Sequence, residues 1–406
     1  MRLRRQTILG LTGYFLIGAA AVLLPSVMPS IDAEYAAAGF SLAAIGLIFP
    51  ARSLGGIVGN LLAGAGADRL GYARLVWMAA LLLAAALALA ASVSPWLLFL
   101  AAFGAIAAAQ GALGAGINAL VADANPQARA KALNTLHAIY GVGAALSPLV
   151  FGSLLARGLA WRWTLAGVAL LWFVYALASL LLQHRSSPPA AERPAPALDL
   201  SMLRARPVLA LFAVAFIYNG VAYSLLGWVA LFMQEAAGFS TFFSISLISI
   251  FYVALTAGRF VCAFASERAG YGRTLLALAV GITVTYPLVV LSSTGLWVAV
   301  GVFLTGLSLS GLFPTAMAYG SRLYPQQTGA ISGALNVSMT LGAMLPPFWT
   351  GIVAERWSFQ AALGVNYVMV VGLLAVTLYL WKTDGGGQTA VCPPPSVVHQ
   401  SKGRFQ

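Results

Sequence analysis

The chain consists mainly of long apolar stretches separated by short polar segments. A bilayer core about 30 Å thick needs about 20 apolar residues of helix, so each stretch is long enough to cross a membrane. The stretches lack the alternation typical of barrel strands, which indicates helices. We expect twelve transmembrane helices, at 8–29, 41–65, 73–92, 95–121, 131–156, 161–183, 208–233, 241–264, 274–293, 296–320, 329–353 and 360–382. The predicted fold class is therefore an all-α membrane protein.

The two halves of the sequence repeat one another at a shift of 199 residues. At this shift Gly39-Phe40-Ser41 falls on Gly238-Phe239-Ser240. The same shift pairs Arg69, Gly71, Tyr72 and Arg74 with Arg268, Gly270, Tyr271 and Arg273, and Pro126, Gly143, Pro148, Gly152 and Arg157 with Pro325, Gly342, Pro347, Gly351 and Arg356. Parallel repeats of this kind predict two pseudo-symmetric six-helix bundles with a substrate site between them near the midplane.

The polar gaps divide the chain into four parts. We expect an N-terminal six-helix bundle at 1–183 and a C-terminal six-helix bundle at 208–382. The segment 184–207 is rich in Pro and Ala with scattered charges, which is typical of a cytoplasmic linker. The segment 383–406 is rich in Gly and Pro and is expected to be a disordered cytoplasmic tail.

Composition excludes a soluble enzyme. Of 406 residues, 61% are hydrophobic and 8% are charged, whereas soluble chains have about 45–50% and about 25%. The net charge of +12 is spread along the chain and does not form one basic module, so no nucleic-acid partner is expected. The cations fall mainly in the loops of one side, which predicts that both termini are cytoplasmic. Compact loops and no transit peptide favour a bacterial inner membrane.

One short motif resembles a known family. Residues 64–74 read G-A-G-A-D-R-L-G-Y-A-R, which resembles the loop 2–3 signature of the major facilitator superfamily, G-x-x-x-D-R-x-G-x-x-R. A degenerate copy at 263–273 has Glu267 as its acid. The resemblance implies two bundles that rock to expose one central cavity to alternate sides. It also implies gating roles for Asp68, Arg69, Gly71, Arg74, Glu267, Arg268 and Arg273.

By the same resemblance Asp68 would contact the start of span eleven, near Thr328 and Gly329, and hold the inner gate shut. The alternative is a solvated loop charge that pairs with a neighbouring arginine.

A second, shorter resemblance concerns the segment 134–148, N-T-L-H-A-I-Y-G-V-G-A-A-L-S-P, with N-A-L-V-A at 118–122 before it. It is similar to the fucose permease-like sugar branch of that superfamily. That branch has embedded carboxylates in spans one and four, whereas span four of this chain offers Gln110, Gly114 and Asn118.

Two arginines lie inside predicted spans. Arg52 is about 20 Å from the inner end of span two, where an arginine costs at least about 2.5 kcal/mol and is expected to face the bundle interior. Its partner is a carbonyl, a polar side chain, water or an anionic part of the substrate. Arg259 lies about 12 Å from the inner surface, where a long side chain can reach water. Both are candidates for substrate binding, and for Arg259 a purely structural role is the alternative.

Polar side chains at membrane depth supply the remaining candidates. His137 is the histidine within a span, and with an ordinary pKa near 6.5 it can take up and release a proton during transport. The alternative for His137 is a packing role. The amide candidates for binding a hydroxyl-bearing solute are Gln110, Asn118, Asn134, Asn219 and Asn336. Such amides also bridge helices structurally.

These observations predict a secondary active transporter that moves a small polar organic solute by alternating access, with a sugar as the first choice and protons as the coupling ion. The alternatives are an organic anion or drug exporter or antiporter of the same fold, and a polytopic membrane enzyme. The acids fall at span ends or in loops, and no His or Cys cluster has metal-ligand spacing, so we expect no catalytic group, metal or cofactor. The expected partners are the solute, protons and the lipid bilayer, and the chain is expected to be a monomer.

Overall fold

The computed structural model describes residues 2–182 and 204–384, and within this part it gives no side-chain placement for residues 2–4, 65, 67, 68 and 130. Nearly all of the expected linker and tail falls outside the described residues. The helices of the first half are α1 (Arg2–Ala21), α2 (Leu23–Ala37), α3 (Leu42–Gly46), α4 (Ile48–Leu70), α5 (Tyr72–Ser92), α6 (Trp96–Ala124), η1 (Pro126–Ala128), α7 (Arg129–Ala156) and α8 (Trp161–Leu181). Those of the second half are α9 (Arg206–Ala237), α10 (Thr241–Ala269), α11 (Tyr271–Leu291), α12 (Gly295–Leu309), α13 (Leu312–Leu323), η3 (Pro325–Gln327), α14 (Thr328–Arg356) and α15 (Phe359–Thr383).

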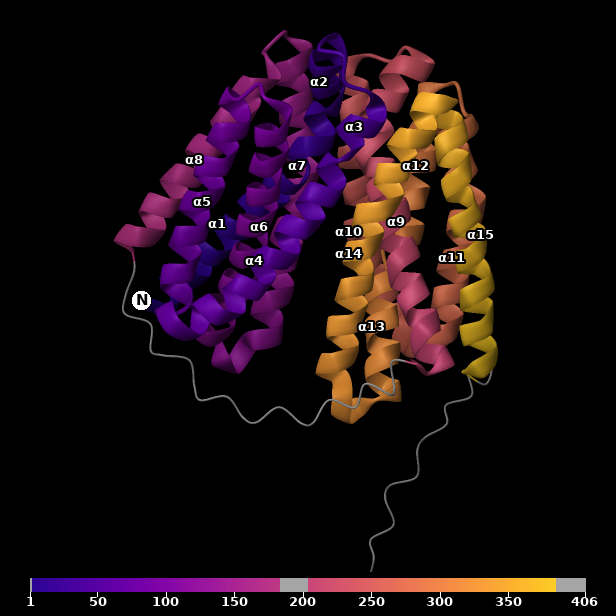
Figure 1. Cartoon of the computed structure of the whole chain (residues 1–406). Coiled ribbons are helices and arrows are strands. Elements are labelled where there is room, and N and C mark those ends of the chain that lie inside the picture. The colour runs from indigo at the N-terminus through magenta and orange to yellow at the C-terminus, as the bar shows by residue number, and fades with distance from the viewer. Residues whose placement is uncertain (1, 183–203, 385–406) are drawn as a thin grey trace, which may run out of the picture.

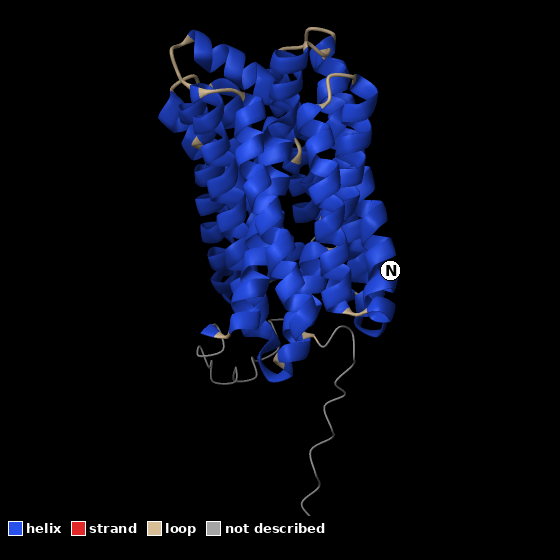
Figure 2. Cartoon of the chain, turned by 90° about the vertical axis from the view of Figure 1, so that its right-hand side faces the viewer, coloured by secondary structure: helices blue, strands red, loops and turns tan. Residues whose placement is uncertain are grey.

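The expected number of membrane-crossing helices is confirmed. Within the described ranges, twelve helical spans are long and apolar enough to cross a membrane. Figure 2 shows the described part of the chain as helices joined by short loops. Most of them extend beyond the bounds expected from the sequence; α9, for example, runs from Arg206 to Ala237 where 208–233 was expected. Apolar residues mark only the part of a helix that lies in hydrocarbon, and backbone hydrogen bonding continues into the polar turns on either side.

Three spans are broken in places that the apolar pattern does not reveal. Span one breaks at Val22, span two at Leu47 and span ten at Ser310-Gly311. A proline follows each break closely, as Pro25, Pro50 and Pro314 respectively. Proline has no amide hydrogen, and its ring crowds the carbonyl four residues earlier, so the helix cannot continue undisturbed through that turn.

The repeat in the sequence is also a repeat in the backbone. Gly71 and Gly270 have positive φ angles of 78° and 87°, and each precedes the third helical span of its half. The hydroxyl of Ser41 accepts a hydrogen bond from the amide of Ala44, and the hydroxyl of Ser240 accepts the equivalent bond from Phe243. These two N-caps stand at the same shift of 199 residues found in the sequence. The chain therefore forms two pseudo-symmetric six-helix bundles.

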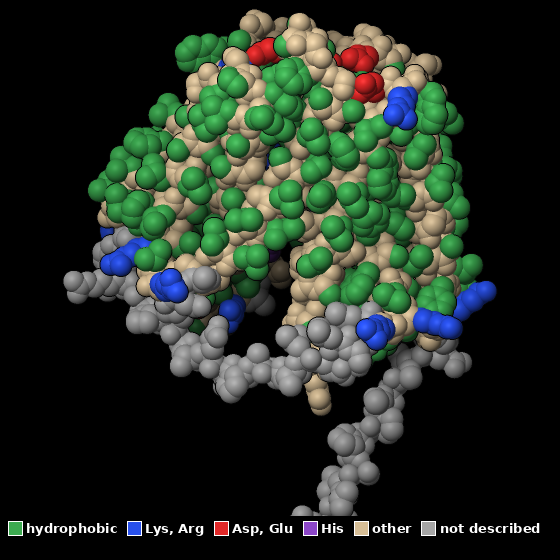
Figure 3. Space-filling model, in the orientation of Figure 1, with side chains coloured by type: hydrophobic (Ala, Val, Ile, Leu, Met, Phe, Trp, Pro, Cys, Tyr) green, Lys and Arg blue, Asp and Glu red, His purple; other side chains and the backbone are tan. Residues whose placement is uncertain are grey.

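The two bundles stand side by side and diverge at one end (Figure 1). The divergent end carries the N-terminus and the ends of α8 and α9 on either side of residues 183–203, and we call it the linker side. At the opposite end, the far side, the bundles touch through α3 and α14 and through α7 and α10. Hydrophobic side chains cover the flank of the molecule, and a hollow between the bundles opens at the linker side (Figure 3).

Helices α4 and α6 pack with their backbones almost in contact. A Cβ atom added at Gly55 or Gly59 would collide with the backbone of Gly104 or Ala108, respectively. Small residues permit such close approach between membrane helices, where interlocking side chains are replaced by direct backbone packing. This close packing therefore fixes the positions of the side chains that project from α4 and α6 toward the second half.

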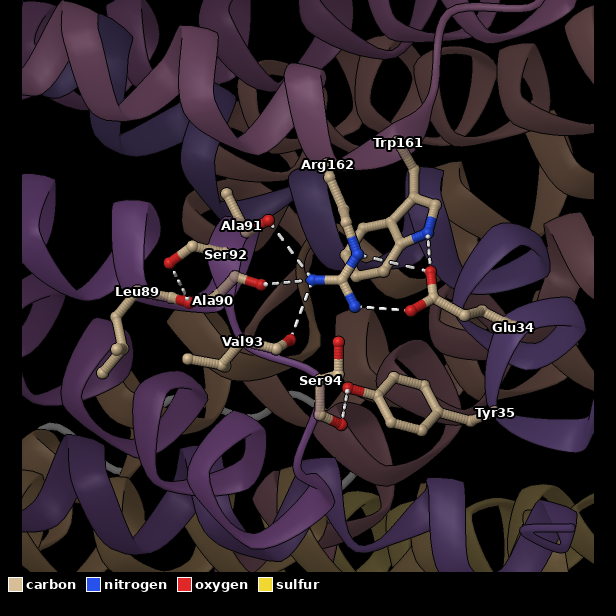
Figure 4. A network of polar contacts seen from close by, with 10 residues as sticks. All are labelled: Glu34, Tyr35, Leu89, Ala90, Ala91, Ser92, Val93, Ser94, Trp161 and Arg162. Atoms are coloured by element: carbon tan, nitrogen blue, oxygen red, sulfur yellow. Dashed lines mark hydrogen bonds and ion pairs between the residues drawn. The ribbon is translucent and has the colours of Figure 1, made fainter. Parts of the chain in front are cut away.

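A polar network closes the far side of the first half (Figure 4). Arg162 donates from Nη2 to Glu34 Oε1 over 2.5 Å, which joins α8 to α2. Its Nη1 donates to the carbonyl oxygens of Val93, Ala91 and Ala90 at 2.8, 3.2 and 3.4 Å. These bonds supply donors to carbonyl groups at the C-terminal end of α5, which have no partner within the helix. Trp161 adds a hydrogen bond from Nε1 to Glu34 Oε2 at 2.9 Å. Three helices are thus fixed to each other at one end of the bundle.

Candidate functional site

The roof of the hollow is formed by aromatic side chains from both halves. Phe49 of α4 lies against Gly227 and Trp228 of α9, and the rings of Phe49 and Trp228 are 5.6 Å apart between centroids. The Trp228 indole donates to the carbonyl oxygen of Pro347 at 2.8 Å, so its ring is fixed to α14. This packing separates the hollow from the far side.

Below the roof lie two adjoining cavities, of about 300 Å³ and about 220 Å³. The larger is lined by both halves, with Tyr14, Gly114, His137 and Tyr140 from the first and Tyr218, Asn219, Tyr223, Tyr252, Arg259 and Met339 from the second among its lining residues. The smaller is lined by Arg52, Asn60, Gln110, Asn219, Tyr223, Asn336 and Met339 among others. Because the two share Asn219, Tyr223 and Met339, they form one central cavity that both bundles line. This is where a transporter with two rocking halves binds its solute.

Arg52 lines the central cavity from α4. Its Nη2 donates to Gln110 Oε1 at 3.3 Å, which is a long contact for a charge-assisted hydrogen bond. The Nε2 group of Gln110 is buried and has no hydrogen-bond partner among the described residues. Both side chains therefore have donor capacity left for a solute.

Arg259 and His137 come from different halves and both lie at the mouth of the cavity. Arg259 of α10 and His137 of α7 both line the larger cavity and also a third pocket of about 420 Å³ on the linker side. The His137 ring contacts the ring of Tyr14 edge-on, with centroids 5.4 Å apart. A cation and a titratable ring thus stand together on the path between the cavity and the linker side.

The amide candidates divide into two groups. Gln110, Asn219 and Asn336 line the central cavity, although Asn219 donates to the Met339 carbonyl at 2.8 Å and Asn336 to the Ser332 carbonyl at 2.8 Å. Asn118 instead donates to the Tyr14 hydroxyl and to the Gly114 carbonyl, and so links α6 to α1. Asn134 is exposed near the start of α7.

The motif residues lie at the linker side. Arg69, Arg74, Glu267, Arg268 and Arg273 are exposed, and Glu267 lines the third pocket at the mouth. The φ and ψ of Gly71, 78° and 153°, lie in a region open essentially to glycine alone. Asp68 lies in α4, and its side chain is outside the described part of the structure. A latch from Asp68 to span eleven stays a prediction.

The charge of the cavity wall is one-sided. Its lining includes Arg52 and Arg259, and among the described side chains that line the two adjoining cavities there is no Asp or Glu. The first carboxylate on the way out is Glu267, in the pocket at the mouth. A cavity of one sign with low-dielectric walls concentrates solutes of the opposite sign.

Sequence reasoning missed two tyrosines of the first half that line the cavity, Tyr14 and Tyr140. Tyr140 had a detectable signal, since it follows His137 by three residues and therefore shares its helix face. Tyr14 had none, because its position depends on how α1 packs against α6 and α7. Together with Tyr218, Tyr223 and Tyr252 they make the wall rich in hydroxyl groups and aromatic faces.

Known proteins resemble this chain over part or nearly all of its length. The uncharacterized MFS-type transporter YfkL of Bacillus subtilis (strain 168) is 23% identical over 391 residues, which is 92% of this chain and 96% of YfkL. The glucose/mannose transporter GlcP of the same organism is 24% identical over 171 residues, or 42% of each chain. Among solved structures, a bacterial homolog of the human lysosomal transporter Spinster, inward-facing and unoccupied, superposes with a TM-score of 0.81 at 15% identity, covering 94% of this chain and 97% of that one.

The family follows from the match to a family model. The model of the Major Facilitator Superfamily matches residues 10–347 and 246–391, so it covers all twelve spans except the first residues of span one. The similarity to the fucose permease-like branch stays a prediction. The signature at 64–74, the two six-helix bundles and this match lead to one conclusion: the chain belongs to the Major Facilitator Superfamily and is a membrane transporter.

Proposed function

We propose that this transporter carries a small organic anion through the central cavity by alternating access. The observation that carries the proposal is the pair of cavity arginines, Arg52 from the first half and Arg259 from the second, in a wall whose described lining has no carboxylate. A guanidinium in a membrane interior is expensive and needs a partner. Among the described residues Arg52 makes the long hydrogen bond to Gln110, a neutral side chain, so a solute carboxylate or phosphate would supply the missing counter-charge.

A sugar is the second candidate. Tyrosine faces and amide groups line the cavity, and such groups stack on sugar rings and bond to hydroxyls. The partial similarity to GlcP points in the same direction. A sugar, however, leaves both guanidinium charges without a counter-charge, which is why we place it second.

We further propose that protons drive or accompany transport, with His137 as the coupling group. It is the cavity side chain whose ordinary pKa lies near neutrality, and it stands at the mouth where water and solute enter. In this proposal the linker side faces the cytoplasm of a bacterial cell and the protein works as a monomer. On the face shown in Figure 3, Lys and Arg gather near the linker side and Asp and Glu near the far side, which agrees with the positive-inside rule.

The test is transport in proteoliposomes that contain the purified protein. Thermal-shift screening of mono- and dicarboxylates, sugar phosphates and neutral sugars first identifies ligands, since a solute that binds the folded state raises the unfolding temperature. Counterflow of the best ligand is then measured with the parent protein and with Arg52→Gln. Saturable counterflow of an anion that Arg52→Gln abolishes supports the proposal. Counterflow of a neutral sugar with no response to any anion refutes it in favour of the second candidate.

A further inference from the structure

Among the contacts that join the bundles at the closed far side, two are related by the internal repeat. In one, the end of α14 meets the start of α3; in the other, the end of α7 meets the start of α10. A Cβ atom at Gly351 would lie 2.9 Å from the Leu42 carbonyl oxygen, and one at Gly152 would lie 3.3 Å from the side chain of Ile245. We call these two interfaces, α3 with α14 and α7 with α10, the seams. Gly152 and Gly351 are partners in the repeat, so the two seams are built alike.

The seams differ one helical turn further along. Glu355 follows Gly351 by four residues, and its Oε2 accepts a hydrogen bond from the backbone amide of Ala43 at 2.9 Å. This bond joins residues 312 positions apart in the sequence and therefore ties the second bundle to the first. At the shift of 199 residues, the partner of Glu355 is Ala156. The seam between α7 and α10 has no acid at this place.

The carboxylate of Glu355 is well placed to stabilise closure. Ala43 lies in the first turn of α3, whose amides have no partner within the helix, and the Ser41 hydroxyl already accepts from Ala44. A negative charge at a helix start is favourable, because the backbone dipoles give this end a partial positive charge. When the far side opens, α3 and α14 separate and the bond is lost, so its free energy counts toward the closed conformation only.

We propose that Glu355 is a one-sided latch of the far side, which biases the transporter toward the conformation open at the linker side, and that Ala156 marks the matching position where a second latch is absent. The proposal does not depend on which solute the cavity takes.

The experiment measures how often the far side opens. Spin labels are attached at Leu159→Cys and Trp297→Cys, two exposed positions near the far end of the first and second bundles, in a Cys262→Ser, Cys392→Ser background. Pulsed electron–electron double resonance on the reconstituted protein then gives the distribution of distances between the two labels. The share of molecules with the longer distance is the far-open share. Glu355→Ala should raise this share about threefold, the size expected for one solvent-exposed, charge-assisted hydrogen bond that is present in one conformation only. Glu355→Gln keeps an acceptor oxygen and should raise it less.

Two further variants make the result specific. Ala156→Glu should create the second latch at the start of α10 and lower the far-open share below that of the parent. Arg356→Ala removes the neighbouring exposed charge and should leave the share unchanged. The proposal is overturned if Glu355→Ala leaves the distance distribution as in the parent, if Arg356→Ala shifts it equally, or if Ala156→Glu raises the far-open share. Because Ala156→Glu adds an interaction, it tests the proposal even if Glu355→Ala does not fold.

Discussion

Glu34 and Arg162 form an ion pair between α2 and α8, with Nη2 and Oε1 2.5 Å apart (Figure 4). The same guanidinium caps the C-terminal end of α5 by donating to the carbonyl oxygens of Ala90, Ala91 and Val93. One side chain therefore holds the far ends of three helices together. The side chains are partly exposed, 23% for Arg162 and 39% for Glu34, so water weakens the pair without removing it.

We expect Arg162→Ala to destabilise the protein by about 1–3 kcal/mol, since the substitution leaves Glu34 and the α5 carbonyls with fewer partners. Thermal unfolding in detergent measures the effect. Arg162→Lys keeps the charge but replaces the planar guanidinium with a compact ammonium group, which has fewer hydrogen-bond donors. Its unfolding temperature should therefore fall between those of the parent and the alanine variant. An unchanged unfolding temperature for Arg162→Ala would show that the network contributes nothing to stability.

Arg52→Gln should reduce binding of an anionic solute by at least about tenfold, because the loss of one charge-assisted hydrogen bond removes about 1.5–3 kcal/mol. Isothermal titration with the ligand found by screening measures the affinity. The matched control is Arg157→Gln at the far end of α7, which removes an exposed arginine away from the cavity and should bind normally. Equal affinities in all three proteins would exclude Arg52 from the binding site.

His137→Gln should abolish uptake driven by a pH gradient and leave counterflow intact. Glutamine keeps a hydrogen-bonding side chain at the cavity mouth but cannot take up a proton. Both activities are measured in the same proteoliposomes, with and without an imposed gradient. Uptake that still responds to the gradient in the variant would remove His137 from the coupling step.

Asp68→Asn should slow exchange while substrate affinity stays the same, since the predicted latch to span eleven acts on the closing of the linker side and not on the cavity. Initial exchange rates at saturating solute, compared with the dissociation constant, separate the two quantities. Glu267→Gln, at the repeat-related position, is the companion variant. A loss of affinity equal to the loss of rate in Asp68→Asn would contradict a gating role.

Gly71→Ala should lower stability by about 1–3 kcal/mol, because φ of 78° with ψ of 153° is strained for any residue with a side chain. Gly64→Ala, in the same motif, is the control: Gly64 lies in α4, and a Cβ atom there would meet no other atom within 4 Å. An alanine at that position should leave the unfolding temperature unchanged or raise it. Both are measured by thermal unfolding, and a Gly71→Ala protein as stable as the parent would show that the turn tolerates a side chain.

The number and order of the spans were predictable, because apolar length is a property of each segment alone. The repeat was also predictable, since Gly71 and Gly270 need glycine for the same backbone reason in both halves. The breaks at Val22 and Leu47 were not predicted, although Pro25 and Pro50 carried the signal. An apolar run continues unchanged through a proline, so counting apolar residues does not detect a break.

The site was predicted less completely. Arg52, Gln110, His137, Asn219, Arg259 and Asn336 line the central cavity or its mouth, because polar groups at membrane depth must face the interior. Asn118 is also a polar residue at membrane depth, yet its amide joins α6 to α1. Which side of a helix faces the other bundle depends on how the helices pack, and a single sequence carries that information only weakly.

The close packing of α4 against α6 has a practical consequence for mutational surveys of this protein. Any side chain introduced at Gly55 or Gly59 collides with the carbonyl group opposite, so a loss of activity there reports a displaced helix. Both positions lie on the helix that carries Arg52, and a scan scored by activity alone would therefore count them as contacts with the transported molecule. Only a scan that also records how much folded protein reaches the membrane can tell a damaged scaffold from a damaged site.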